Sequence, residues 1–200
     1  MPSTTISLFL MTLLQQVYAI GYHFPTPPGG IRSPKHHTAL LVLGPTCAAS
    51  TLWAASQSTS SPPLSSTFGL IATVCFLASL ALFTWTAITT RPRRFSVIFG
   101  KAQPEYVVTH GPYAYIRHPT YVSYALTWIG AMAQLLEVSR PRRFATLVAV
   151  TSFGGLMCLF REGAKQEEEE FRNDAKSEGV KRDYDEYASR VRARWVPTAW

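Results

Sequence analysis

Two stretches of this 200-residue chain hold nearly all of the side chains that could do chemistry. The first is residues 105–121, EYVVTHGPYAYIRHPTY, in which the turn signals Gly111-Pro112 and His118-Pro119 flank aromatic and basic residues. Aromatic rings at the mouth of a helix suit a cationic ligand, because the ring quadrupole attracts positive charge. By residue type alone, an interfacial loop that anchors a bilayer boundary is the commoner explanation.

The second stretch is residues 165–197, which opens on the acidic cluster Glu167–Glu170. Such a cluster is usually the solvated start of a helix, where the macrodipole favours negative charge. An apolar stripe follows at helical spacing: Tyr184, Tyr187 and Val191. Arg190 and Arg194, four residues apart, are expected on another face of the same helix. A helix with this stripe would lie against the membrane or against the first stretch.

The charges that surround these stretches are unevenly spread. The first ninety residues contain no Asp or Glu, and no Lys, Arg, Asp or Glu lies between Lys35 and Arg91. From Arg161 to Trp200 there are nine Lys or Arg and ten Asp or Glu. Fifty-five consecutive residues without a charge require an apolar environment, which excludes a uniformly soluble globule. The net charge of +7 lies in short clusters between apolar runs, which is typical of membrane proteins rather than of nucleic-acid binding.

Apolar segments long enough to approach the ~17–20 residues that a bilayer crossing needs occur five times. They are Thr5–Tyr22, Thr38–Ala55, Phe68–Ile88, Tyr121–Leu136 and Phe144–Phe160. We therefore expect an all-α, polytopic integral membrane protein with about five transmembrane helices and a cytoplasmic C-terminal helical segment. Residues 1–90 would form N-terminal transmembrane helices and residues 91–200 a second region. The second region divides into a loop (105–121), a helical hairpin (121–160) and a polar tail (161–200).

The basic residues predict the orientation. The loop with Arg32 and Lys35 and the stretch 91–120, with five Lys or Arg, would be cytoplasmic, whereas residues 56–67 carry none. Five crossings place the tail on the cytoplasmic side too. Arg140, Arg142 and Arg143 would then lie on the far side, so either the charge bias is overruled there or the hairpin is partly re-entrant.

The cysteines predict neither a metal site nor a disulfide framework. Cys47, Cys75 and Cys158 lie inside apolar stretches at no metal-like spacing. We expect them to be small buried side chains.

The order of the motifs resembles the isoprenylcysteine carboxyl methyltransferase family of the endoplasmic reticulum membrane. Gly111-Pro112-Tyr113 is followed by Arg117-His118-Pro119-Thr120-Tyr121, an apolar hairpin, the acidic cluster, the tyrosine stripe and a closing Arg with Val196-Pro197. The resemblance covers Glu105–Pro197. Phospholipid methyltransferases carry a similar signature, and some membrane reductases share part of the tail pattern.

The resemblance implies a site for S-adenosylmethionine. The matching positions are Glu105, Tyr106, Val107, Val108, Tyr113, His118, Pro119, Thr120, Tyr121 and a glutamate of the acidic cluster. The family usually has histidine where this chain has Glu105. Its glutamate follows a substrate-facing arginine by four residues, so we expect Glu169, with Lys165 in place of the arginine. The alternative register uses Glu167 and puts Gly163 where the cation belongs.

The reaction implied is methyl esterification of the C-terminal carboxylate of a prenylated cysteine, on a protein or a small prenyl-cysteine. A carboxyl of pKa ~3.5 is ionised at neutral pH, so in-line transfer needs no general base. Catalysis would be alignment and removal of water. Lys165, Arg190 and Arg194 are expected to position the carboxylate, although lysine lacks the bidentate fork of arginine. The lipid substrate would enter from the bilayer.

Three other functions stay open at this point. A phospholipid N-methyltransferase would share the cofactor but attack through a deprotonated amine. A membrane NADPH-dependent reductase could use Arg190, Arg192 and Arg194 for a 2′-phosphate. A non-enzymatic scaffold is compatible with Glu105 and Lys165 at two family positions.

Overall fold

The computed structural model describes residues 4–23, 30–56, 66–90, 98–101, 103–137 and 143–195. Six α-helices and one turn of 3-10 helix make up this part of the chain, which contains no strand. They are α1 (Thr4–His23), α2 (Pro34–Ser56), α3 (Thr67–Thr90), η1 (Gly111–Ala114), α4 (Pro119–Glu137), α5 (Arg143–Asn173) and α6 (Glu178–Arg190). A single antiparallel bridge pairs Ile31 with Gly100. The all-α expectation is confirmed.

Each of the five predicted apolar segments forms a helix, α1 to α5. Within the described residues, α3 and α5 are long and apolar enough to cross a membrane by length and composition. Only 28 % and 33 % of their most apolar stretches are buried inside the protein, whereas the core helix of a soluble protein is mostly buried. Five crossings remain a prediction.

The last predicted segment extends further than expected. Helix α5 does not end at Phe160 but continues through the acidic cluster to Asn173. The extension is rich in Glu, Lys, Gln and Arg, which are good helix formers. One rigid element therefore joins the apolar part, Phe144–Phe160, to the polar part.

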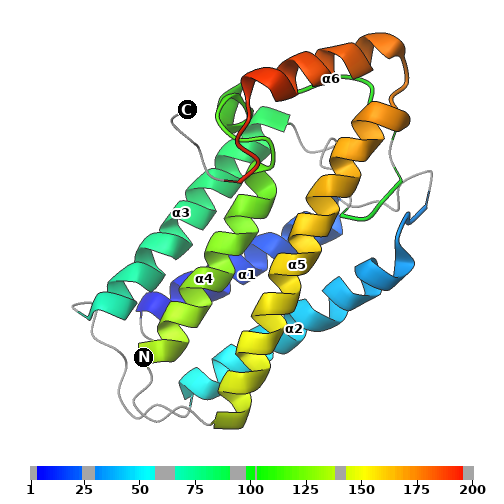
Figure 1. Cartoon of the computed structure of the whole chain (residues 1–200). Helices are drawn as coiled ribbons and strands as arrows, with labels where there is room; N and C mark the ends of the chain where they lie inside the picture. Colours follow the sequence, from blue (N-terminus) through cyan, green and yellow to red (C-terminus); the bar gives the residue numbers. More distant parts are fainter. Residues whose placement is uncertain are drawn as a thin grey trace.

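Successive helices α1 to α5 run in alternating directions (Figure 1). The main packing pairs are α3 with α4 and α2 with α5. Aromatic rings join α1 to the first pair, because Phe9 stacks on Phe76 at 5.4 Å and meets Trp128 edge-on at 6.3 Å. Helix α6 lies across one end of the bundle, above the end of α5 and beside residues 103–118 (Figure 1).

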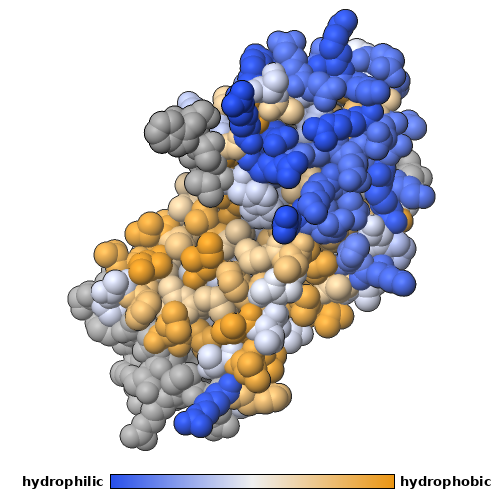
Figure 2. All heavy atoms as spheres, viewed as in Figure 1, coloured by the Kyte–Doolittle hydropathy of each residue, from blue (hydrophilic) through white to orange (hydrophobic). Residues whose placement is uncertain are grey.

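The surface divides into an apolar belt and a charged cap. In Figure 2 hydrophobic residues cover the shafts of the helices, and hydrophilic residues gather at the end that carries α6. Each of α1 to α5 exposes large apolar side chains, among them Leu14, Val42, Ile88, Leu136 and Leu147. Contiguous apolar surface of this extent marks a membrane or protein contact.

Proline and serine fix the helix ends near the cap. Pro119 occupies the first position of α4, where a missing N–H costs nothing. Ser177 caps α6, since its side chain accepts a hydrogen bond from the Val180 N–H. Arg140 and Arg142 lie outside the described residues, and Arg143 begins α5. The side of the membrane on which that turn lies stays a prediction.

The cysteines divide by environment. Cys47 is buried, as expected, and Cys75 is half-buried. Cys158 is exposed on α5, so the expectation of burial is wrong there. Its helix face is turned away from the neighbouring helices.

Candidate active site

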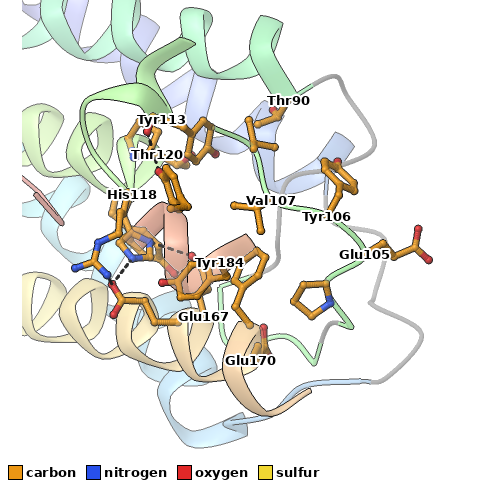
Figure 3. Close-up of a pocket in the computed structure, with 18 of the residues that line it drawn as sticks. Thr90, Glu105, Tyr106, Val107, Tyr113, His118, Thr120, Glu167, Glu170 and Tyr184 are labelled. Atoms are coloured by element: carbon orange, nitrogen blue, oxygen red, sulfur yellow. Dashed lines mark hydrogen bonds and ion pairs between the residues drawn. The ribbon is translucent and has the colours of Figure 1, made fainter. Parts of the chain in front are cut away.

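A cavity of about 370 Å³ lies between the cap and the bundle, within the ~300–1,000 Å³ of small-molecule sites. Its walls come from the end of α3, residues 103–121, the top of α4, the polar end of α5 and α6. In Figure 3 the labelled side chains other than that of Glu105 converge from these segments. Elements far apart in the sequence thus meet around one space.

Nine of the ten sequence-predicted cofactor positions line this cavity. They are Glu105, Tyr106, Val107, Val108, Tyr113, His118, Pro119, Thr120 and Tyr121. The carboxylate of Glu105 points away from the other labelled side chains in Figure 3. It lies 2.7 Å from the Nζ of Lys176, so this side chain ties the loop to the turn before α6.

The tenth position, Glu169, is exposed and does not line the cavity, whereas Glu167 does. Helix geometry is the reason, because residues i, i+3 and i+4 share a face. Gly163, Glu167 and Phe171 follow this spacing, and Glu169 points elsewhere. The structure therefore brings the alternative register, not the preferred one, to the cavity.

The cations expected to position a carboxylate are not placed together. Neither Lys165 nor Arg190 lines the cavity, and the Nζ of Lys165 lies 3.8 Å from Glu162 on the surface. Arg190 ends α6, so the expected helical pairing with Arg194 is wrong. Val191 leaves helical geometry, and the next residues bond to the loop instead.

Backbone hydrogen bonds connect this C-terminal segment, residues 191–195, to the top of α4. The N–H of Arg117 donates to the carbonyl of Ala193 at 2.9 Å, and that of His118 to Arg194 at 3.2 Å. The hydroxyl of Tyr187 donates to the carbonyl of Tyr113 at 2.8 Å. The tyrosine stripe thus packs on the first stretch, one of the two alternatives that the sequence left open.

Glu168 is the centre of a buried charge network. Its side chain is 2 % exposed and accepts two hydrogen bonds from Arg194, at 3.0 and 2.8 Å. Arg117 lies 3.1 Å from the same carboxylate. Burial by itself would raise the pKa of Glu168, but the His118 hydrogen bond and the Arg117 charge outweigh it and lower that pKa below 4.5.

His118 lies between two carboxylates. Its Nδ1 is 3.3 Å from Glu167 and its Nε2 is 3.1 Å from Glu168. Burial would lower the pKa of His118, but the hydrogen bonds to both glutamates raise it above 6.5. Carboxylate oxygens only accept hydrogen bonds, so the protonated form of His118 can donate from both ring nitrogens, to Glu167 and to Glu168.

Aromatic rings and carboxylates give the cavity its chemistry. Phe171 stacks on Tyr184 with ring centres 4.6 Å apart, and Tyr121 donates a hydrogen bond to Glu167 at 2.9 Å. Aromatic faces next to carboxylates attract a cationic ligand. Such a cavity can hold a sulfonium or ammonium group while its apolar walls exclude water.

Several lining residues had no assigned role in the sequence analysis. Arg117, Glu168 and Tyr184 stood in recognised motifs, but their contacts depend on three separate segments meeting. Glu170 also lines the cavity and lies 3.1 Å from Arg32, two residues before α2. The one sequence signal that could have placed Glu170 at the site is its position three residues after Glu167.

The fold and the site define a class: an all-helical, apolar-belted protein with a small-molecule cavity under a charged cap. The model of the isoprenylcysteine carboxyl methyltransferase family matches residues 70–173, half of the chain. The protein belongs to that family. Neither a curated protein nor a solved structure matches the chain. The matched range contains α3, the loop, α4 and α5, and hence most of the cavity wall.

Proposed function

We propose that the protein transfers a methyl group from S-adenosylmethionine to the C-terminal carboxylate of a prenylated cysteine. The observation that carries this proposal is the convergence of nine motif positions on one cavity in a chain of this family. They lie in residues 105–121, in the loop and the first turn of α4, and α5 adds Glu167 and Phe171 to the same cavity from a separate part of the sequence. A methyltransferase needs such a pocket to align a soluble cofactor with a lipid substrate.

The lining residues fit the cofactor. We assign Glu167 to its ammonium group and the rings of Tyr113 and Tyr184 to the neighbourhood of its sulfonium. S-adenosylmethionine held by these residues would supply a methyl group on a positively charged sulfur: the acceptor's carboxylate oxygen would bond to the methyl carbon, and the carbon–sulfur electron pair would leave with the sulfur of S-adenosylhomocysteine. No proton moves, so none of the residues needs to act as a general base.

The residues of the chain would act by alignment. Tyr121 and His118 hold the Glu167 carboxylate from two sides, at 2.9 and 3.3 Å, so that it meets its ligand without rearrangement. Phe171 and Tyr184 close the wall with apolar surface, which removes water from the reacting oxygen. The rate of methyl transfer would depend on how precisely these side chains are positioned.

The belt and the cap suit a lipid acceptor. We propose that α1 to α5 lie in the endoplasmic reticulum membrane, with the cap on the cytoplasmic side. A prenyl chain would then remain in the bilayer while the carboxylate reaches the cavity. Arg32, Arg117 and the charges of α6 lie at the end that the charge bias assigns to the cytoplasm.

A second candidate is methylation of a lipid amine. It is favoured by the absence of Lys165, Arg190 and Arg194 from the cavity lining within the described residues. Arg117 and His118, which do line it, lie against glutamates. No comparable observation favours the reductase.

Methyl-labelled S-adenosylmethionine separates these functions. Membranes containing the protein receive it with either N-acetyl-S-farnesylcysteine or phosphatidylethanolamine. We expect base-labile label on the prenyl-cysteine, its loss in Tyr113→Ala, and its retention in Glu162→Gln, which changes a surface pair outside the cavity. Label in the phospholipid alone would establish the second candidate, and no cofactor binding would refute both.

A further inference from the structure

Tyr124 carries a buried hydroxyl that has no hydrogen-bond partner among the described residues. The residue is 5 % exposed and lies one turn below Tyr121 on α4. Its ring packs between Phe83 at 6.1 Å and Phe160 at 5.9 Å. A phenylalanine would satisfy these contacts equally well, so packing does not explain the oxygen.

Tyr124 is one of the residues that line the cavity. Two of the described residues that line it, Tyr124 and Arg117, each have a buried polar atom without a hydrogen-bond partner: the hydroxyl of Tyr124 and the Nε of Arg117. A buried polar group without a partner is costly, and such groups are usually satisfied. Two unused donors on one cavity indicate a ligand that brings acceptor atoms.

The surroundings of the two donors differ. Arg117 lies at the charged end, 3.1 Å from Glu168. Tyr124 lies among aromatic rings, below the loop and toward the apolar belt. A lipid-linked acceptor that remains in the bilayer would reach the Tyr124 end first.

We propose that the hydroxyl of Tyr124 donates a hydrogen bond to the carboxylate of the methyl acceptor and orients it. This inference rests on the proposed carboxyl methyltransferase function and replaces the cations that the sequence suggested for this task. A neutral donor has a chemical advantage, because it orients the carboxylate without neutralising the charge that attacks the methyl carbon.

The hydrogen bond would also discriminate between substrate and product. The carboxylate is a charged acceptor, and hydrogen bonds to charged groups are stronger than those to neutral ones. The methyl ester presents a neutral carbonyl and would be held less tightly. Tyr124 would therefore favour binding of the acid and release of the ester.

Binding measurements on Tyr124→Phe test the proposal. The purified full-length protein, saturated with S-adenosylhomocysteine, is titrated with N-acetyl-S-farnesylcysteine and with its methyl ester. We expect Tyr124→Phe to raise the Kd of the acid about tenfold, to leave the Kd of the ester within twofold and to leave cofactor affinity unchanged. The KM of the acid should rise in parallel. Tyr115→Phe, which removes a hydroxyl outside the cavity, is the matched control.

Thermal stability separates this role from a structural one. Removing a buried hydroxyl without a partner should leave the Tm unchanged or raise it. Three results for Tyr124→Phe would each overturn the role of Tyr124 while leaving the proposed function intact. They are a lowered Tm, weaker binding of the cofactor, and an unchanged preference for the acid over the ester. A wild-type protein that binds the cofactor but transfers no methyl to the prenyl-cysteine would overturn the proposed function, and this inference with it.

Discussion

Glu167 and Glu169 are two positions apart, and the helix turns them to different sides. Glu167 shares the cavity face of α5 with Gly163 and Phe171, whereas Glu169 faces outward. Spacing from a cation favoured Glu169, since Lys165 precedes it by four residues. Burial favours Glu167 as the cofactor residue, because Glu169 is exposed. This difference in burial depends on the packing of α5 against the loop.

Substitution of the two glutamates distinguishes the registers. We expect Glu167→Gln to weaken S-adenosylmethionine binding by about tenfold or more, because a hydrogen bond to a charged group contributes ~1.5–3 kcal/mol. Glu169→Gln should stay within twofold. Isothermal titration of both purified variants measures this, and the reverse order would return the site to Glu169.

The interaction of His118 with Glu168 predicts how the stability of the folded protein depends on pH. Because the pKa of His118 is raised in the folded protein, its contribution is complete below pH 6.5 and is lost as the pH rises through the folded value. The pKa of Glu168 is lowered, so its contribution is present above pH 4.5 and is lost on acidification below it. Between these limits both groups are charged and stabilise each other.

We therefore expect the Tm in detergent to fall as the pH rises from 6 to 9. Each kcal/mol lost shifts the Tm by about 2–4 °C in a chain of this size. His118→Gln should have a lower Tm at pH 6 and a flatter profile. His110→Gln, an exposed histidine of the same loop, should keep the wild-type slope. A steep profile in His118→Gln would show that another group titrates.

At the scale of elements, α5 contributes both to the apolar belt and to the candidate site. Its first part contributes to the apolar belt, and its extension carries Glu167, Glu168 and Glu170 into the site. Gly163 lies where the two parts join. A Cβ there would come 2.7 Å from the hydroxyl of Tyr121 and 3.2 Å from Ile98, so α5 can approach α4 only without a side chain.

Gly163→Ala should therefore destabilise the protein by about 1–3 kcal/mol through overpacking. It should also weaken cofactor binding, because Tyr121 must move away from Glu167. Gly154→Ala on the same helix has open space around its Cβ and is the matched control. Its Tm should equal or exceed that of the wild type, since alanine favours helix over glycine. Equal effects of the two substitutions would contradict the close contact.

At the scale of the whole molecule, the belt and the cap predict an orientation. Glu178 lies at the start of α6 in the cap, and Arg143 lies at the opposite end of α5. If α5 crosses the bilayer, these residues are on opposite sides. Single cysteines at the two positions, in a chain without its native cysteines, report this directly.

We expect a membrane-impermeant maleimide to label Glu178→Cys from the cytoplasmic side of sealed vesicles. Arg143→Cys should react only after the vesicles are opened. Labelling of both sites without opening would contradict a spanning α5 and would support the partly re-entrant hairpin. A detergent-solubilised sample in which both react provides the control.

Much of the architecture could be predicted from the sequence. The uncharged runs gave the positions of α1 to α5 because helices in an apolar environment must be apolar over most of their length. The turn signal His118-Pro119 stands at the start of α4, two residues before the apolar segment predicted from Tyr121. The end of α5 could not be located in this way, since a polar segment can continue a helix without any change in hydrophobic pattern.

By itself the sequence determined which five segments are apolar and helical, and that the motif positions 105–121 and the acidic cluster belong to one family. These properties depend on residue type and local spacing. Tertiary structure alone decided which glutamates of the acidic cluster line the cavity, which cations lie against Glu168 and, within the described residues, which lining hydroxyl has no hydrogen-bond partner. Those outcomes depend on the rotation of each helix and on contacts between distant segments, and no local pattern encodes either.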